Sequence, residues 1–127
     1  MFIVAGAQAH SSFKKTQLLN RLASLSSVQS IESQWIYLFD QALNEQQHQS
    51  ALQLLNDGAS FEVRQAESDE IQILVTPRLG TISPWSSKAT DIFANCNTPI
   101  HRLERGVLFT LKGISEISAE VKLALHD

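Results

Sequence analysis

Apolar and polar positions change their period along the chain, and each change marks an expected element. Leu18, Leu22 and Leu25 recur at the spacing of one helix face, whereas the alternation across residues 31–39 favours a strand. The first half is predicted to begin with a buried strand at 2–4 and a helix that is capped by Ser11 or Ser12 and ends near Ser26. A strand at 31–39 should follow, and then a helix that is capped by Asn44 with Gln47 and ends at Gly58. The second half is predicted to begin with a buried strand at 71–75 and an irregular segment at 77–84. A helix should follow, capped by Ser86 or Ser87 and ending near Cys96, with Ala89, Ile92 and Phe93 facing inward. The last two expected elements are a strand at 100–111, ended by Gly113, and a helix with Ile117, Val121, Ala124 and Leu125 on one face.

The order strand, helix, long strand, helix occurs twice along the chain. A shift of 70 residues superposes the two halves without a gap, so that Ile3 falls on Ile73 and Phe39 on Phe109. Residue identity at this shift is near chance, and the matching apolar pattern is what indicates a duplication. We therefore expect one α+β domain over residues 1–127. It would consist of two pseudo-repeated strand-helix-strand-helix halves, 1–58 and 71–127, which share one core and are joined by an exposed acidic connection at 59–70.

Composition and charge exclude several classes of function. The net charge of −3 is not that of a nucleic-acid binder. The single cysteine, Cys96, excludes an internal disulfide, and we expect it to be a small, partly buried core residue. The histidines lack metal-ligand spacing, so no metal site is expected, and His48 should be half-buried at the edge of its helix. No apolar run is long enough to cross a membrane, and no basic residue precedes the apolar start, so a first strand and a cytoplasmic protein are expected.

The segment around Gly80 to Lys88 superficially resembles known catalytic loops but lacks their essential residues. A phosphate-binding P-loop needs glycine before its lysine and serine or threonine after it, whereas Ser87 precedes Lys88 and Ala89 follows it. The serine-x-x-lysine motif of acyl-transfer enzymes fails as well, because Trp85 stands at the serine position.

The same region nevertheless gathers more functional side chains than packing requires, and it is the candidate site. Its residues are Arg78, Ser83, Trp85, Ser86, Ser87, Lys88, Thr90 and Asp91. Free backbone amides near Ser86 and Ser87, helped by Arg78 and Lys88, would receive an anion. Alternatively, the loop docks on another protein surface with Trp85 as its buried anchor, or it is purely structural with Ser86 as a helix cap.

A second polar cluster, of mixed charge, follows the candidate site. It consists of His101, Arg102, Glu104 and Arg105, and we expect it to form an exposed strand face, with a phosphate-binding patch as the alternative.

The run from Val75 to Ile92 resembles the N-terminal region of the large, single-chain phosphoribosylformylglycinamidine synthase, also called formylglycinamide ribonucleotide amidotransferase. Further similar stretches are Asn97 with residues 102–107, Leu54-Leu55 before Gly58, and the ending Leu125-His126-Asp127. The resemblance covers essentially the whole chain. Leu79 departs from it, because proline is expected there in relatives, but the turn should persist since Gly80 is retained.

This resemblance implies a role within a far longer parent enzyme, a ligase of purine biosynthesis. Enzymes of the family convert formylglycinamide ribonucleotide, ATP and glutamine into formylglycinamidine ribonucleotide. Their glutaminase cysteine and their ATP, magnesium and ribonucleotide sites lie outside the region matched here, so no catalytic, cofactor or metal residue is expected in this chain, and Cys96 is not the glutaminase cysteine.

The resemblance also implies a fold and a set of partners. The domain would resemble a dimer of the small accessory subunit of split versions of the enzyme. It would bridge the synthetase and glutaminase domains and support substrate access and ammonia transfer, with Arg78 and residues 85–88 placed against the synthetase domain. The isolated chain would be catalytically silent and prone to self-associate through the apolar loop around Ile82 and Trp85. A stand-alone phosphate- or nucleotide-binding module and a purely structural interaction domain are the alternatives.

Overall fold

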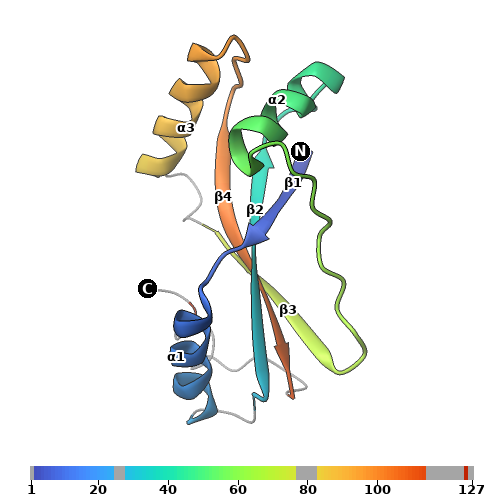
Figure 1. Cartoon of the computed structure of the whole chain (residues 1–127), viewed down its shortest axis with the longest axis vertical. Coiled ribbons are helices and arrows are strands. Elements are labelled where there is room, and N and C mark those ends of the chain that lie inside the picture. The colour runs from blue at the N-terminus through green and yellow to red at the C-terminus, as the bar shows by residue number, and fades with distance from the viewer. Residues whose placement is uncertain (1, 25–27, 77–82, 114–124, 126–127) are drawn as a thin grey trace. The chain divides into compact units, whose positions relative to one another are not determined.

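The computed structural model describes residues 2–24, 28–76, 83–113 and 125 (Figure 1). The elements in chain order are β1 (Phe2–Gln8), α1 (Ser12–Ala23), β2 (Ser30–Phe39), α2 (Glu45–Asn56), β3 (Glu70–Val75), α3 (Pro84–Asn95) and β4 (Leu103–Lys112). The strands form one antiparallel sheet in the order β1-β2-β4-β3. The expected α+β class is confirmed, and within the described residues no helix combines the length and the apolar character that a membrane span needs.

The described chain divides into two compact units that do not follow the expected halves. Unit 1 comprises Met1–Ala7, Trp35–Val63 and Thr76–Gly106, and unit 2 comprises Gln8–Gln34, Arg64–Val75 and Val107–Asp127. Each unit therefore draws segments from both halves, and the duplication stays a prediction. Buried apolar residues form one cluster in each unit, and the expected single core is not confirmed. β2 and β4 each contribute residues to both clusters.

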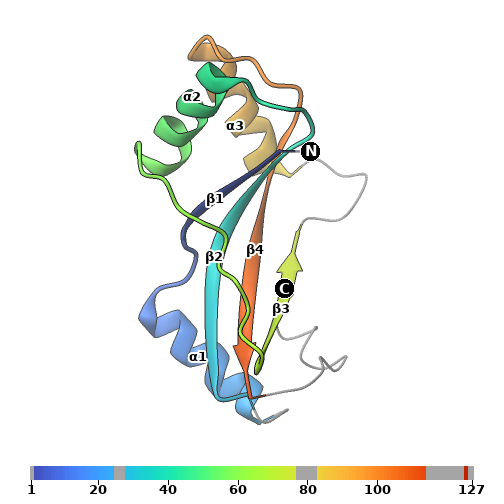
Figure 2. The ribbon, with the colours of Figure 1, turned by 90° about the vertical axis from the view of Figure 1, so that its right-hand side faces the viewer.

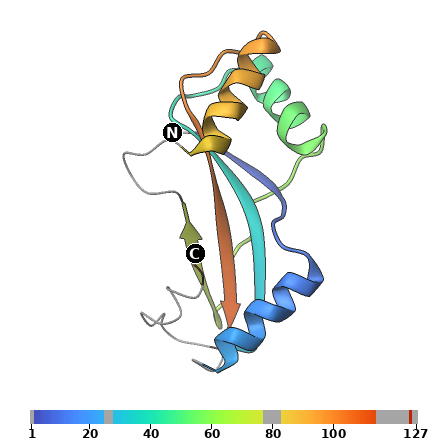
Figure 3. The ribbon, with the colours of Figure 1, turned by 90° about the vertical axis from the view of Figure 1, so that its left-hand side faces the viewer.

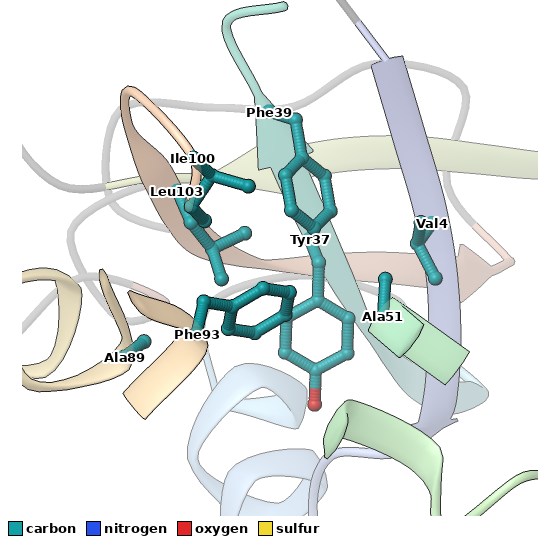
Figure 4. Close-up of a cluster of buried hydrophobic side chains, with 8 residues drawn as sticks. All are labelled: Val4, Tyr37, Phe39, Ala51, Ala89, Phe93, Ile100 and Leu103. Carbon is teal, nitrogen blue, oxygen red and sulfur yellow. The ribbon is translucent and has the colours of Figure 1, made fainter. Parts of the chain in front are cut away.

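The core of unit 1 is built from β1, β2, α2, α3 and the start of β4 (Figure 4). Its buried members are Val4, Tyr37, Phe39, Ala51, Ala89, Phe93, Ile100 and Leu103. The rings of Phe39 and Phe93 meet edge to face, with 5.9 Å between centroids. Gly6 allows β1 to lie close, because a Cβ there would be 2.7 Å from Tyr37 Cε2 and 2.9 Å from Trp35 Cβ. Figure 2 and Figure 3 show α2 and α3 at the same end of β2 within this unit.

The core of unit 2 packs α1 against the first half of β2 and the second half of β4. Its buried members are Leu22, Val28, Ile31, Phe109, Leu111 and Leu125. β3 pairs with this part of β4, with Ile73 opposite Phe109. The expectation that β3 is buried is wrong, because every residue of β3 is at least partly exposed and Leu74 is 43% exposed. β3 is one of the two edge strands of the described sheet, and its partner there is β4.

Most of the predicted helix ends are confirmed by their local hydrogen bonds. Ser11 caps α1, and Asn44 with Gln47 forms the capping box of α2. α2 ends where Asp57 adopts a left-handed conformation with φ of 55°, followed by Gly58 with φ of 86°. His48 is half-buried, as predicted, and residues 57–69 form the exposed connection.

Besides the start of α3, three boundaries differ from the predictions by three or more residues. β1 is longer, α1 ends at Ala23, and β4 begins at Leu103, three residues after the predicted start at 100. The predicted irregular segment lies outside the described residues over 77–82. The predicted last helix is also outside them, apart from the buried Leu125.

Glu70 gives unit 2 a pH-dependent contribution to stability. Its carboxylate accepts hydrogen bonds from the backbone N–H of Glu67 at 3.0 Å and from Arg64 Nη2 at 3.1 Å. The Glu67 N–H, and then Arg64, hold the pKa of the Glu70 carboxyl below its ordinary value. A carboxyl with a depressed pKa stabilises the fold above its unfolded pKa of about 4.3, and this contribution is lost as pH falls through the folded pKa.

We therefore expect the melting temperature to decrease below about pH 4 more steeply in the unmodified chain than in Glu70→Gln. Thermal unfolding followed by circular dichroism over this pH range measures the difference. Glu67→Gln is the control, because it keeps the backbone N–H that Glu70 uses. Superimposable pH profiles for Glu70→Gln and the unmodified chain would contradict this assignment.

Candidate functional site

The candidate site lies on the first turns of α3, which begins earlier than predicted. Ser83 is the N-cap, and its Oγ accepts a hydrogen bond from Ser86 N at 3.0 Å. Pro84 occupies the first turn, where a missing N–H has no cost. The prediction of a cap at Ser86 or Ser87 was therefore wrong by three or four residues, because Pro84 was interpreted as a helix breaker.

The backbone amides that were expected to be free for an anion have partners within the helix. Ser86 N donates to Ser83 Oγ, and Ser87 N donates to Ser83 O at 3.2 Å. The carboxylate of Glu104 lies at the same terminus and accepts from Ser83 Oγ at 2.9 Å. This negative charge is placed where the helix dipole favours an anion. The expectation of free amides near Ser86 and Ser87 is therefore wrong.

Removal of this cap is expected to lower the free energy of unfolding. Ser83→Ala loses the hydrogen bond to Ser86 N and the partner of Glu104, at a cost of about 1 kcal/mol. Ser87→Ala is the control, because Ser87 is exposed within the helix and alanine favours helix there. Urea denaturation compares the two variants, and an equal effect of both substitutions would contradict the assignment of Ser83 as the cap.

The other candidate residues divide into structural and exposed ones. Ser86 is buried and its Oγ donates to Leu103 O, while Thr90 Oγ1 donates to Ser86 O at 2.8 Å. Both hydroxyls therefore serve the attachment and geometry of α3. The exposed candidates are Ser87, Lys88 and Asp91. Arg78 lies outside the described residues.

Trp85 is half-buried, and its ring contacts other side chains of unit 1. It stacks on Tyr37 with 5.9 Å between centroids, and the Arg105 guanidinium carbon lies 4.7 Å from its centroid. The same guanidinium lies 4.2 Å from the Trp35 centroid, so Arg105 is in cation–π contact with two tryptophans. Burial raises the pKa of the Tyr37 phenol above its ordinary value, although the charge of Arg105 acts in the opposite direction. The phenol is therefore neutral at physiological pH.

The expectation of an exposed mixed-charge strand face is wrong for most of its members. The Glu104 side chain is 12% exposed, and its carboxylate forms an ion pair with Arg102, whose Nη2 donates a hydrogen bond to it at 3.3 Å. Arg105 contacts the two tryptophans, and His101, which precedes β4, is the exposed member and pairs with Asp40 at 2.7 Å. Glu104 and Arg105 are partly buried because the Glu104 carboxylate contacts the N-terminus of α3 and the Arg105 guanidinium packs on two tryptophan rings.

A cavity of about 210 Å³ adjoins Trp85. It is lined by Tyr37 of β2, by Leu54 and Leu55 of α2, and by Trp85, Lys88, Ala89, Ile92 and Phe93 of α3. Ile92 was expected to face inward, but it is 45% exposed, because the core face of α3 is carried by Ala89 and Phe93. Among the described residues that line it, Lys88 is the one that carries a charge. An apolar wall with a single cation suits an apolar side chain of a polypeptide better than a phosphate group.

Cys96 is exposed at the C-terminal cap of α3, so the expectation of a partly buried core residue is wrong. It follows the last turn of the helix, beyond the face that carries Phe93.

Within residues 2–24, 28–76, 83–113 and 125, no group of three or more His, Cys, Asp or Glu residues could hold a metal ion.

Some site residues were missed by the sequence analysis, namely Trp35, Tyr37, Leu54, Leu55 and the role of Arg105. A signal for two of them was present, because alternation along β2 places Trp35 and Tyr37 on one face. The contact of that face with Arg105 depends on the pairing of distant segments.

A comparison with protein-family models places most of the chain in a known family. The family model described as formylglycinamide ribonucleotide amidotransferase N-terminal matches residues 32–127. The match begins in β2 and includes every described residue of the cavity and of the α3 terminus. The chain therefore belongs to the formylglycinamide ribonucleotide amidotransferase N-terminal family.

Proposed function

We propose that the chain is a non-catalytic accessory domain of the parent amidotransferase, which makes formylglycinamidine ribonucleotide with glutamine and ATP in purine biosynthesis. Family membership supports the place in that enzyme. The candidate hydroxyls of Ser83, Ser86 and Thr90 support the non-catalytic role, because they serve the cap and packing of α3. ATP, magnesium and the glutaminase cysteine would all belong to other parts of the parent enzyme.

The proposed contact with the parent enzyme is a docking surface made of Trp85, Lys88 and Ile92 on α3 with Leu54 and Leu55 on α2. The observation that carries this proposal is Ile92, a 45% exposed apolar residue on the wall of an apolar cavity. Exposed apolar surface beside a cavity is typical of protein–protein contacts. An apolar side chain of the synthetase domain would enter the cavity, and a carboxylate beside it would pair with Lys88.

In this proposal the domain bridges the synthetase and glutaminase parts and supports substrate access and ammonia transfer. Arg78, outside the described residues, stays a candidate for contact with the synthetase domain or its substrate. The duplication belongs to the same proposal, with a resemblance to a dimer of the small accessory subunit. It is supported by the strand order β1-β2-β4-β3. Exchanging β1 with β3 and β2 with β4 gives β3-β4-β2-β1, which is the same order counted from the other edge of the sheet.

The docking surface can be tested by placing a charge on it in the full parent enzyme. Ile92→Glu is expected to reduce glutamine-dependent synthesis at least tenfold, because a desolvated charge costs about 2 kcal/mol or more at an apolar contact. Ammonia-dependent synthesis and glutaminase activity are measured beside it, to locate the defect in the coupling or in the synthetase itself.

Phe13→Glu is the matched control, because Phe13 is also an exposed apolar residue on a helix, at 74% exposure in unit 2. Its activity should stay within twofold of the unmodified enzyme. The docking surface would be rejected if Ile92→Glu kept full activity, or if Phe13→Glu lost as much.

A further inference from the structure

Unit 2 contains a second cavity, of about 200 Å³, that the accessory role does not use. Its lining residues are His10, Lys14, Gln17, Leu18, Arg21, Phe109 and Leu125. Lys14, Gln17 and Arg21 follow one another at intervals of three and four residues, so α1 presents them on a single face. Phe109 and Leu125 are the buried apolar residues of the lining.

The charge of this cavity is opposite to that of the chain. The chain carries a net charge of −3, whereas the described lining residues include two cations and no Asp or Glu. Both cations are exposed, and among the described residues neither takes part in an ion pair. Lys15, the next residue along α1, is paired with Glu32 at 3.0 Å and does not line the cavity. Adjacent lysines of one helix therefore have different surroundings.

An aromatic wall completes the cavity. The His10 ring stacks on Phe109 with 5.5 Å between centroids and 20° between planes. His10 Nδ1 is 2.8 Å from Ser33 Oγ, which fixes the orientation of the imidazole. Lys14 and Arg21 line the same cavity as these two rings.

We propose that this cavity binds a small phosphate monoester that carries a ring or another apolar group. The phosphate dianion would be held by Lys14 and Arg21, with Gln17 donating a hydrogen bond, because guanidinium and ammonium groups are the usual donors to phosphate. The ring would pack on the wall formed by His10, Phe109 and Leu18. A volume near 200 Å³ is below the roughly 300–1,000 Å³ of pockets for drug-sized ligands, and so selects a small metabolite.

The test uses the 127-residue chain and phenyl phosphate as the probe, with inorganic phosphate and phenol as its two halves. Isothermal titration calorimetry at low salt measures affinity, and NMR shifts of Gln17 and Phe109 locate the site. We expect saturable binding of phenyl phosphate with a Kd of about 1 mM or tighter, and at least tenfold weaker binding of either half.

Lys14→Gln and Arg21→Gln should each weaken binding of phenyl phosphate about fivefold or more, since each removes one charge from the phosphate end. Lys15→Gln is the matched control, because it removes the same charge from the same helix outside the cavity, and it should change the affinity less than twofold. Glutamine is a good helix former, so all three variants should keep the fold.

Absence of saturable binding would overturn the proposal, and so would an equal loss in Lys15→Gln, which would indicate non-specific charge attraction. Equal affinities for phenyl phosphate and inorganic phosphate would also reject a site with an aromatic wall. None of these results bears on the docking surface, whose residues belong to unit 1.

Discussion

Replacement of Phe93 by alanine is expected to lower the free energy of unfolding by about 3–5 kcal/mol. Phe93 is 2% exposed and is the largest buried side chain of α3 in the core of unit 1. Its ring meets Phe39 edge to face, so the substitution loses an aromatic contact and leaves a void beside it. Urea denaturation of the purified chain measures the change.

Ile92→Ala is the control for Phe93→Ala. The two residues are adjacent on α3, but Ile92 is 45% exposed and lines the cavity instead of the core. Its replacement should cost less than about 1 kcal/mol. If both substitutions destabilised the chain equally, the orientation of α3 described here would be wrong.

The second large effect is expected in the core of unit 2. Leu22→Ala should lower the free energy of unfolding by about 2–5 kcal/mol, because Leu22 is fully buried and belongs to the core cluster that contains Ile31 and Leu111. The same denaturation experiment measures it, with Phe13→Ala as the control on the same helix. Phe13 is 74% exposed, so its replacement should stay within about 0.5 kcal/mol.

The double variant of Phe93 and Leu22 tests whether the cores are separate. The two clusters have no residue in common, so the two effects should add within about 0.5 kcal/mol. Strong non-additivity would contradict the division of the buried residues into two clusters. A stabilisation or a neutral effect from Leu22→Ala would contradict the burial of α1.

The sequence predicted those features that depend on neighbouring residues. Asn44 and Gln47 form the capping box because both partners lie within one helical turn. Leu22 is buried where the leucine spacing placed it, and Gly58 and Gly113 have positive φ where the elements end. Such signals are local, and for this reason they could be interpreted without the rest of the fold.

The errors arose where one signal had two physical meanings or where the partners are distant in sequence. Pro84 disfavours a helix interior but suits the first turn, so the start of α3 was placed too late. The contact of Arg105 with Trp35 and Trp85 joins residues that are 70 and 20 positions apart. Nothing local to Arg105 indicates those partners, and its charge was therefore assigned to solvent.

The partial burial of β3 could not be predicted from its apolar sequence either. Ile71, Ile73 and Val75 are typical of a central strand, but β3 is at the edge of the sheet, and Leu74 is exposed. The strand order depends on the pairing with β4, which begins 28 residues after the end of β3.

The central claim is that this chain supports the parent amidotransferase by docking on it, and restoration in trans tests that claim most directly. Glutamine-dependent synthesis would be measured for the parent enzyme without residues 1–127, alone and with the purified chain added. We predict low activity that the unmodified chain restores and that the Ile92→Glu chain does not restore. Full activity without the chain would contradict an accessory role. Failure of the chain to restore a truncated enzyme that is folded and keeps its glutaminase activity would contradict docking as a separate domain.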